Sequence, residues 1–311
     1  MKKAFSLIEL MVVVAIIGIL AGVLLASFGG GTASARAARC LSNMKNLANA
    51  AQTYGMMAQY YPVAGNIVRM QIKDARAGVR PEKEYDEFPG WISANSQGMF
   101  PAKGSSSQPQ SVSMYSDNDE EALYALTNGA IWKYVSANRE TYVCPEHVKK
   151  MKSVKVRWSY LMNAYFGWSQ NGRPRAYGNN ADRVNFRDFS KAEKVLLFSE
   201  VPFMGYNAWQ PEGEGATSDT DPILNYGKTS DLDGKASTYA GNAASAEEIG
   251  VNHVSGRNAY AHVVFADGHT EKLRVPMVGK KPDTSGFAEL TTWLCAGFDV
   301  SFDGKRYNRV K

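Results

Sequence analysis

The chain begins with residues 1–31, which read MKKAFSLIELMVVVAIIGILAGVLLASFGGG. Two lysines open this stretch, and the nineteen residues Leu10–Phe28 contain no charge. As a helix they would be about 28 Å long, close to the roughly 30 Å hydrocarbon core of a bilayer. Glu9 is the only charged residue between Lys3 and Arg36. A carboxylate beside such a run is costly in lipid unless it is paired, so its position needs an explanation.

Neither a secretory signal peptide nor a plain membrane anchor explains the carboxylate of Glu9. A secretory signal peptide also combines a basic start with an apolar core, and Ala33-Ser34-Ala35 could serve as its cleavage site. The apolar run is longer than the roughly 7–15 residues usual for such a peptide, and Glu9 interrupts it. A plain membrane anchor with its lysines in the cytoplasm would fit the length, but it gives no reason for a carboxylate.

The segment AFSLIEL at residues 4–10 resembles the processing site of the type IV pilin and type II secretion pseudopilin families. The resemblance implies that prepilin peptidase cuts between Ala4 and Phe5 and methylates the new amine of Phe5. Glu9 would then be the fifth residue of the mature chain. These families usually have glycine before the cut, where this chain has Ala4. Other implied partners are pilin or pseudopilin subunits and an inner-membrane assembly platform.

The same resemblance implies that Glu9 acts in assembly. The ammonium group of Phe5 in one subunit can pair with Glu9 of a neighbour inside an apolar bundle, and breaking such a pair costs roughly 3–5 kcal/mol. Gly18 and Gly22 add a spacing of small residues that lets helices approach closely. The implied location is the inner membrane, crossed once with the head in the periplasm, and later a filament in the periplasm or on the cell surface.

The rest of the chain has the composition of a globular domain. Of 311 residues, 44% are hydrophobic and 21% are charged, which excludes a disordered chain. The net charge of +5 includes the two lysines of the expected leader and is too small and dispersed to favour nucleic acid. Cys40, Cys144 and Cys295 form no CxxC or Cys/His spacing, so the sequence predicts no zinc module and no metal cofactor.

A long helix is expected to join the N-terminus to a head domain. Gly29-Gly30-Gly31 should break or soften this helix. An apolar stripe from Leu41 to Tyr61 then indicates an amphipathic helix that Pro62 ends. The predicted fold class is α+β, with the helix packed on an antiparallel β-sheet as in pilin-like proteins. The predicted divisions are a leader at 1–4, a transmembrane and assembly helix at 5–28, its amphipathic continuation at 29–62 and a head at 63–311.

Within the head, a few clear patterns stand between long loops. Residues 154–166 and 194–200 are rich in aliphatic and aromatic side chains and predict strands. Asp267-Gly268 between two β-rich runs predicts a hairpin. Residues 116–135 predict one helix, or two short helices divided near Asn128-Gly129.

A second resemblance is to a subfamily of pilin-like proteins, and it rests on the segments RCLSNMKNL, YVCPEH, SYLMNAYFG and VNHVSGRNAYAHVVFADGHTEKL. That subfamily carries a processing-associated histidine separated from Asp-Gly by nine residues. Here thirteen residues separate His253 from Asp267, and only four separate His262 from Asp267. The implied equivalents are therefore His253, with a lengthened loop, and Asp267 with Gly268.

Cys40 and Cys144 both lie in these family-like segments, whereas Cys295 does not. The resemblance therefore implies a Cys40–Cys144 disulfide that would fasten the head to the helix. A Cys144–Cys295 bridge and three buried thiols are the alternatives. A location outside the cytoplasm would permit either bridge.

Three histidines, His253, His262 and His269, gather near Asp267 in the sequence. A metal site would need their imidazoles and a carboxylate to converge at short range. His262 and His269 flank the predicted turn, where side chains alternate in direction, so a structural hairpin is favoured over a metal site.

Other candidate sites rest on weaker patterns. Asp231 and Asp233 are candidate calcium ligands by similarity to the calcium-binding loops of major pseudopilins, although the spacing of an EF-hand is absent. No GxSxG, HExxH, SxxK or P-loop pattern occurs, so the sequence predicts no enzyme. Trp91, Trp168 and Trp209 lie near glycines and prolines and could form a carbohydrate-binding surface, although aromatic side chains more often belong to a core.

The predicted function is that of a processed and methylated pilin-like or pseudopilin subunit, assembled into a type II secretion pseudopilus or a type IV pilus-like filament. The alternative is a membrane-tethered or filament-tip adhesin that binds a carbohydrate or another surface ligand. A periplasmic enzyme on a pilin-like anchor is a third class, for which the sequence offers no catalytic residues.

Overall fold

The computed structural model describes the chain in separate stretches. These are residues 7–64, 67–69, 86–88, 90–92, 99–100, 110–111, 123, 125–150, 155–163, 166, 169–170, 173–174, 192–201, 223–224, 249–255, 258–279, 281–283, 290–291, 294–295, 300–302 and 307–309, with no side chain described at 22–30. The expected cleavage site between Ala4 and Phe5 lies outside them, as do the calcium candidates Asp231 and Asp233.

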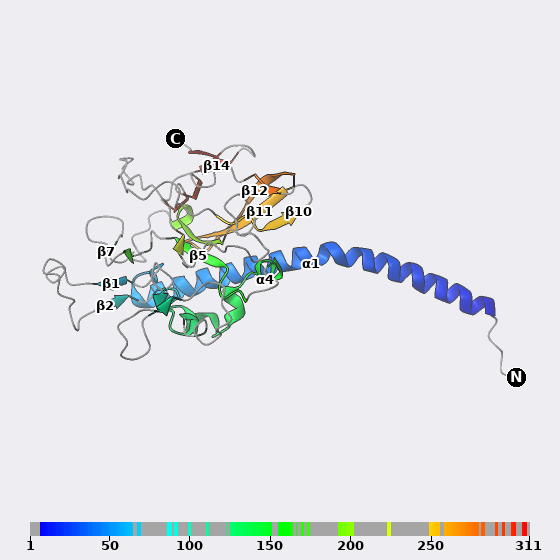
Figure 1. Cartoon of the computed structure of the whole chain (residues 1–311), viewed down its shortest axis with the longest axis horizontal. Helices are drawn as coiled ribbons and strands as arrows, with labels where there is room; N and C mark the ends of the chain where they lie inside the picture. The colour runs from blue at the N-terminus through cyan, green and yellow to red at the C-terminus, as the bar shows by residue number, and fades with distance from the viewer. Residues whose placement is uncertain are drawn as a thin grey trace.

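The longest element is α1, Leu7–Ala58, a helix of 52 residues whose first half projects from the rest of the molecule (Figure 1). It continues through Gly29-Gly30-Gly31, so the expected break at this point does not occur. Each glycine costs about 1 kcal/mol relative to alanine, but extending an existing helix needs no new nucleation step. The helix ends before Pro62 because Gln59 adopts a left-handed φ of 66°.

The two halves of α1 lie in different surroundings. Side chains from Leu7 to residue 21 are exposed, whereas from Ala37 onward one face of the helix is buried in the head. The predicted amphipathic helix is therefore confirmed, although Leu41 is only partly buried. The buried apolar residues of this face are Ala37, Cys40, Met44, Leu47, Ala48, Ala50 and Ala51. No helix within the described part of the chain combines the length and the apolarity that a membrane crossing requires.

A seven-stranded sheet packs on this buried face, and the strands run in the order β13-β12-β11-β8-β5-β9, with β10 also paired to β11. All pairs are antiparallel except β5 with β9. The predicted helix-on-sheet architecture is confirmed. The strands are β5 Tyr160–Asn163, β8 Leu196–Glu200, β9 Ile223–Leu224, β10 His253–Ser255, β11 Asn258–Phe265, β12 Thr270–Val278 and β13 Lys281–Pro282.

The predicted hairpin at Asp267-Gly268 joins β11 to β12. The two strands pair from Asn258 with Pro276 to Val264 with Thr270. Gly268 has a φ of 88°, which favours glycine, and a Cβ there would meet the Gln52 side chain of α1 at 3.0 Å. The turn is thus fitted against the helix as well as closed by its own backbone.

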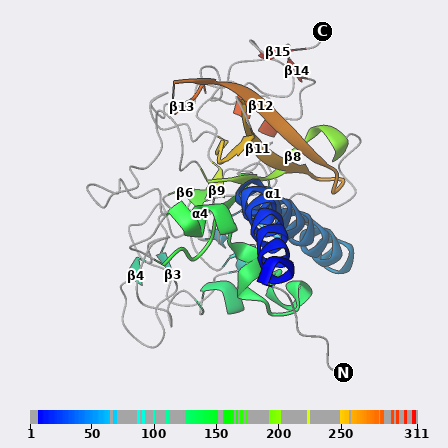
Figure 2. The ribbon, with the colours of Figure 1, turned by 90° about the vertical axis from the view of Figure 1, so that its right-hand side faces the viewer.

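The segment 125–150 covers α1 on a side away from the sheet, and Figure 2 shows the helix between the two. It contains two 3-10 helices, η1 Trp132–Val135 and η2 Arg139–Tyr142, and the short helix α4 Pro145–Lys150. A turn at Asn128-Gly129 separates the helical residues 125–127 from η1. This agrees with the predicted alternative of two short helices divided at that point. A Cβ at Gly129 would lie 2.4 Å from the Trp91 carbonyl oxygen, so only glycine fits there.

The remaining described elements are short. They are η4 Ala192–Lys194 and the two-stranded pairs β1 Ile67–Arg69 with β2 Asp86–Phe88, β3 Met99–Phe100 with β4 Gln110–Ser111, β6 Ser169–Gln170 with β7 Arg173–Pro174 and β14 Val300–Phe302 with β15 Tyr307–Arg309.

Trp91 lies in the core shared by these layers. It is fully buried, stacks on Tyr142 with ring centroids 5.8 Å apart and meets Phe198 edge-on at 5.0 Å. This ring is therefore a packing residue and offers no surface for a sugar. Trp168 and Trp209, the other two residues of that suggestion, lie outside the described residues.

Candidate functional site

A row of polar side chains crosses the sheet beneath α1. Tyr160 of β5 pairs with Glu200 of β8, and the register of β8 with β11 places His262 on the other side of Glu200. Residues directly opposite one another in antiparallel strands point to the same face. The strand register alone therefore brings a phenol, a carboxylate and an imidazole together in the interior.

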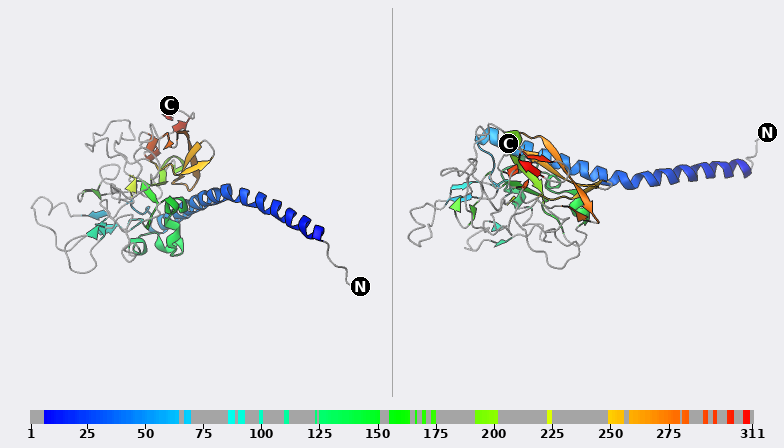
Figure 3. Two further views of the ribbon diagram at one scale, coloured as in Figure 1. Left: turned by 45° about the vertical axis from the view of Figure 1, so that its right-hand side comes forward. Right: turned by 90° about the horizontal axis from the view of Figure 1, so that it is seen from above.

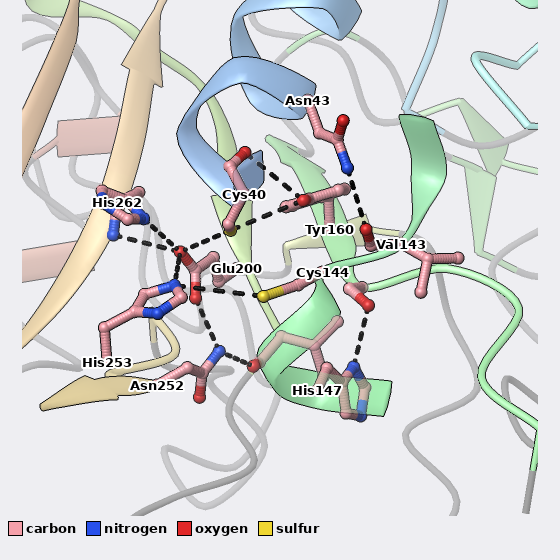
Figure 4. Close-up of polar contacts among 12 residues, drawn as sticks. Cys40, Asn43, Val143, Cys144, His147, Tyr160, Glu200, Asn252, His253 and His262 are labelled. Carbon is pink, nitrogen blue, oxygen red and sulfur yellow. Dashed lines mark hydrogen bonds and ion pairs between the residues drawn. The ribbon is translucent and has the colours of Figure 1, made fainter. Parts of the chain in front are cut away.

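Glu200 is the centre of this arrangement (Figure 4), and its side chain is fully buried. Its Oε1 lies 3.1 Å from Cys40 Sγ, 3.0 Å from His253 Nε2 and 2.9 Å from His262 Nδ1. Its Oε2 accepts a hydrogen bond of 2.9 Å from the side-chain amide of Asn252. Three separate segments of the chain thus converge on one carboxylate.

Cys144, just before α4, completes the group. Its position depends on Asn43, whose side-chain amide donates to the carbonyl oxygens of Glu140 and Val143, each at 2.9 Å. These bonds hold the chain before Cys144 against α1, within one turn of Cys40. Figure 4 shows both thiols beside Glu200.

The ligand atoms of Cys40, Cys144, Glu200 and His253 all lie within 4.8 Å of one another. All four residues are at most 3% exposed. Two sulfurs, one imidazole nitrogen and one carboxylate oxygen form a donor set that can hold a metal ion. Among the described residues, these four form the group of His, Cys, Asp and Glu side chains that lie close enough together to hold a metal ion.

The carboxylate of Glu200 and the imidazole of His253 form an ion pair. Burial acts to raise the pKa of Glu200, but the charge and hydrogen bond of His253, with the hydrogen bond from His262, outweigh it and hold the pKa far below its usual range. Burial likewise acts to lower the pKa of His253, whereas the Glu200 charge and the hydrogen bond to Cys144 raise it to about 10. The buried carboxylate is thus stable only because a cation stands beside it.

The two thiols differ although they are neighbours. Burial raises the pKa of Cys40 well above its usual range, and Cys144 and Glu200 act in the same direction. For Cys144 burial again acts upward, but hydrogen bonds from Cys40 and His253 bring its pKa down to about 7. Cys144 is therefore the thiol that gives up its proton more readily.

A further buried imidazole, His147 of α4, lies next to the group. Its Nδ1 lies 3.0 Å from Ser159 Oγ, and burial lowers its pKa to about 3 in spite of the nearby Glu200 charge. This side chain is therefore neutral and serves packing and hydrogen bonding.

Comparison with known proteins bears on the other end of the molecule. Residues 1–25 match the model of the prokaryotic N-terminal methylation motif. The chain carries a prepilin-type methylation motif. The motif supports a type IV pilin-like or pseudopilin subunit, which is a structural rather than a catalytic kind of protein, and it suggests a membrane anchor. No curated protein and no solved structure gives a match.

The prepilin-type motif contains one predicted site residue that the structure describes, Glu9 in the first turn of α1. The match ends at residue 25, so the C-terminal His–Asp-Gly resemblance stays a prediction. The structure separates the members of that pattern along β11, because His253 pairs with Tyr260 near one end and Asp267 lies in the turn after Phe265, at the other end.

His269 stays with Asp267 in the turn, where its Nδ1 pairs with the carboxylate and its ring stacks on Phe265 at 4.3 Å. The three histidines therefore do not gather at Asp267: two turn to Glu200 and one remains at the hairpin. The structural interpretation of the hairpin holds for His269, whereas His253 and His262 belong to the buried group.

Cys40 and Cys144 are brought together, as the predicted disulfide requires, and all three cysteines are present as buried free thiols. The bridge itself stays a prediction. Glu200 is the residue that sequence reasoning missed. The apolar segment KVLLFSE predicts a strand, and Glu200 is its last residue. A carboxylate at the end of such a segment was the one sign in the sequence of a buried acid.

Proposed function

We propose that this chain is cut between Ala4 and Phe5, methylated at Phe5, and assembled as a structural subunit of a type II secretion pseudopilus or a type IV pilus-like filament. The main support for this proposal is the methylation motif at residues 1–25. The motif includes the beginning of α1, and this part of the helix stands outside the head. Both views in Figure 3 have the N-terminal half of α1 free of the globular part.

The projecting half of α1 presents apolar side chains in every direction. The five consecutive residues from Leu10 to Val14 are each between 48% and 64% exposed. Successive residues turn by about 100°, so these five cover the whole circumference. A helix that is apolar all round is stable where no face meets water. We infer that it lies in the inner membrane before assembly, with the head in the periplasm, and among the helices of neighbouring subunits afterwards.

Glu9 gives that helical bundle its register. After cleavage, the ammonium group of Phe5 on one subunit would meet Glu9 of a neighbour in apolar surroundings, where an ion pair tolerates no mismatch. A subunit out of register would leave both charges buried and unpaired. Prepilin peptidase, other subunits and an inner-membrane assembly platform are the partners that this proposal requires.

The mature N-terminus tests the processing step. Intact-mass analysis should find a chain that begins at Phe5 and carries one added methyl group. The same chain expressed without prepilin peptidase should begin at Met1 and serves as the control. A mature start at Arg36 would instead reveal an ordinary signal peptide and overturn the proposal.

Substitution of Glu9 tests the assembly step. Glu9→Gln and Glu9→Ala should be processed normally and keep a folded head, yet form no filaments, because the partner of the Phe5 ammonium group is gone. Val12→Ile, an apolar exchange on the same projecting helix, should assemble like the parent chain. Filaments of normal number from Glu9→Gln would show that this carboxylate does not set the register.

A further inference from the structure

We propose that Cys40, Cys144, Glu200 and His253 together bind one zinc ion that fastens the head to α1. The four side chains come from α1, from the segment before α4, from the end of β8 and from the start of β10. The proposal does not depend on whether the chain forms a filament. It departs from the expectation of no metal, which rested on the absence of a recognisable cysteine spacing.

The distances among the ligand atoms are close to those of a tetrahedral site. Ligands at about 2.0–2.3 Å from zinc lie about 3.3–3.8 Å from one another. Glu200 Oε1 lies 3.0 Å from His253 Nε2 and 3.1 Å from Cys40 Sγ, and His253 Nε2 lies 3.9 Å from Cys144 Sγ. Only small side-chain adjustments are needed to place the four atoms around one ion.

Glu200 Oε1 shows why a cation belongs at the centre. Cys40 Sγ, His253 Nε2 and His262 Nδ1 all lie within 3.1 Å of this one oxygen. A carboxylate oxygen has about two lone pairs and cannot accept three such hydrogen bonds well. A thiol and two imidazoles that crowd around one carboxylate oxygen suggest that some of these groups are ligands of a shared cation.

Neighbouring groups orient the ligands as the outer shell of a metal site does. His262 Nδ1 and the Asn252 amide engage the two oxygens of Glu200 at 2.9 Å each. The Tyr160 hydroxyl donates to Cys40 Sγ at 3.4 Å. Such contacts fix the direction of ligating carboxylates and thiolates and raise metal affinity.

The donor set and the burial indicate the kind of metal and its role. Thiolate and imidazole ligands suit zinc, whereas calcium and magnesium prefer oxygen alone. Four protein ligands with exposures of 0–3% leave no open position for water or substrate. A closed site of this kind is structural, so the ion would contribute to folding rather than to catalysis.

The sequence separations explain what the ion would stabilise. Cys40 lies 160 residues from Glu200, and Cys144 lies 109 residues from His253. A single ion would therefore join the helix, both sides of the head and two strands of the sheet. Binding by the native chain and not by the unfolded chain stabilises the fold by mass action.

A Cys40–Cys144 disulfide is the chemical rival, because it would use the same two sulfurs and leave no thiolate for a metal. It would leave Glu200 and His253 as a buried ion pair beside the bridge. An ion uses all four groups, and each thiol gives its proton to solvent as the metal–sulfur bond forms.

Metal and thiol content of the full-length chain tests the proposal. The protein should be extracted in detergent without chelator or reductant. Mass spectrometry of the elements should find about one zinc per chain, and thiol titration after unfolding with a chelator should find all three cysteines reduced. Replacement of zinc by Co²⁺ should give the thiolate charge-transfer and visible bands of a tetrahedral site. Chelation should lower the melting temperature of the head.

Matched variants assign the ligands. Cys144→Ser and His253→Gln should each reduce bound zinc to less than about a tenth of the parent value, whereas Cys295→Ser, at the buried cysteine outside the group, should keep it. The Co²⁺ spectrum of the parent chain decides the matter if either ligand variant fails to fold. The proposal is overturned by a Cys40–Cys144 disulfide in the isolated chain, by a parent chain without zinc, or by full zinc content in both ligand variants.

Discussion

The two halves of α1 are one continuous helix in two different environments. Residues 7–21 are apolar except for Glu9 and are exposed all round, whereas from Ala37 to Ala58 one face packs into the head and the other meets solvent. Backbone hydrogen bonding is the same in both, so side chains alone make the difference. The first half requires a partner outside the chain, and the second half already has one inside it.

This contrast separates assembly from folding. A change in the second half should alter the stability of the head, and a change in the first half should alter insertion or assembly and leave the head intact. Substitutions of the same kind in the two halves therefore test whether assembly and folding depend on different parts of α1.

The largest expected effect on the head comes from Leu47→Ala. Leu47 is fully buried between α1 and the head, and truncation of such a side chain costs about 2–5 kcal/mol. Thermal unfolding followed by circular dichroism should show a clear fall in the melting temperature. The control Leu20→Ala changes a side chain that is 58% exposed and should leave that temperature unchanged. Equal losses from the two substitutions would refute the division of α1.

Asn43→Ala should have the next largest effect. The substitution removes the buried hydrogen bond to the Val143 carbonyl, and a lost buried partner of this kind costs about 1–3 kcal/mol. The Glu140 carbonyl also loses the Asn43 amide but still accepts from the Val143 N–H. Denaturant unfolding should report the loss. Asn49, six residues further along α1, is exposed, and Asn49→Ala should change the free energy of unfolding very little.

A smaller effect is expected where the helix enters the head. Arg36 pairs with Glu146 of α4, and their side chains are 22% and 13% exposed. Screening by solvent limits such a pair to about 1 kcal/mol or less. Arg36→Gln should lower the free energy of unfolding by this amount at low salt and by less at high salt. Arg39, whose pair with Glu140 is 59% and 69% exposed, supplies the control substitution Arg39→Gln, expected to have no measurable effect.

Gly18→Ala should leave the head unaffected and act on assembly alone. A Cβ at Gly18 meets nothing within 4 Å in the single chain, and alanine favours the helix by about 1 kcal/mol. If neighbouring helices approach closely at this point, the added methyl group should reduce filament yield in electron micrographs. Gly31→Ala, which also meets nothing within 4 Å, tests whether position along the helix matters. Identical yields for both variants and the parent would remove Gly18 from the assembly surface.

Local patterns predicted the elements that local chemistry forms. The apolar period anticipated the buried half of α1, and Asp267-Gly268 anticipated the hairpin, because helix packing and turn geometry each depend on residues close in sequence. The same local reasoning overestimated Gly29-Gly30-Gly31, since the cost of a glycine competes with the cooperativity of a long helix. It also began the strand predicted at 154–166 too early, because the described residues 155–159 precede β5 Tyr160–Asn163 and are not part of it.

The buried group around Glu200 was beyond such reasoning. Glu200 lies 53 residues from His253 and 160 residues from Cys40, and none of the spacings in the group resembles a known metal motif. Cys40 and Cys144 were paired by resemblance, but the carboxylate and the histidine that join them depend on the registers of β5, β8, β10 and β11. A register is decided by the packing of whole strands, and a shift of one residue would turn Glu200 to the other face.

The sequence by itself determined the prepilin-type N-terminus, the long helix and the hairpin, because contiguous residues form each of them. Only the tertiary structure decided that His253 leaves the Asp-Gly turn, that Glu200 lies between two thiols and two imidazoles, and that these groups meet under α1. The physical reason is distance along the chain. Groups so far apart in sequence come together only when the strands pair in the correct register and α1 packs on the sheet.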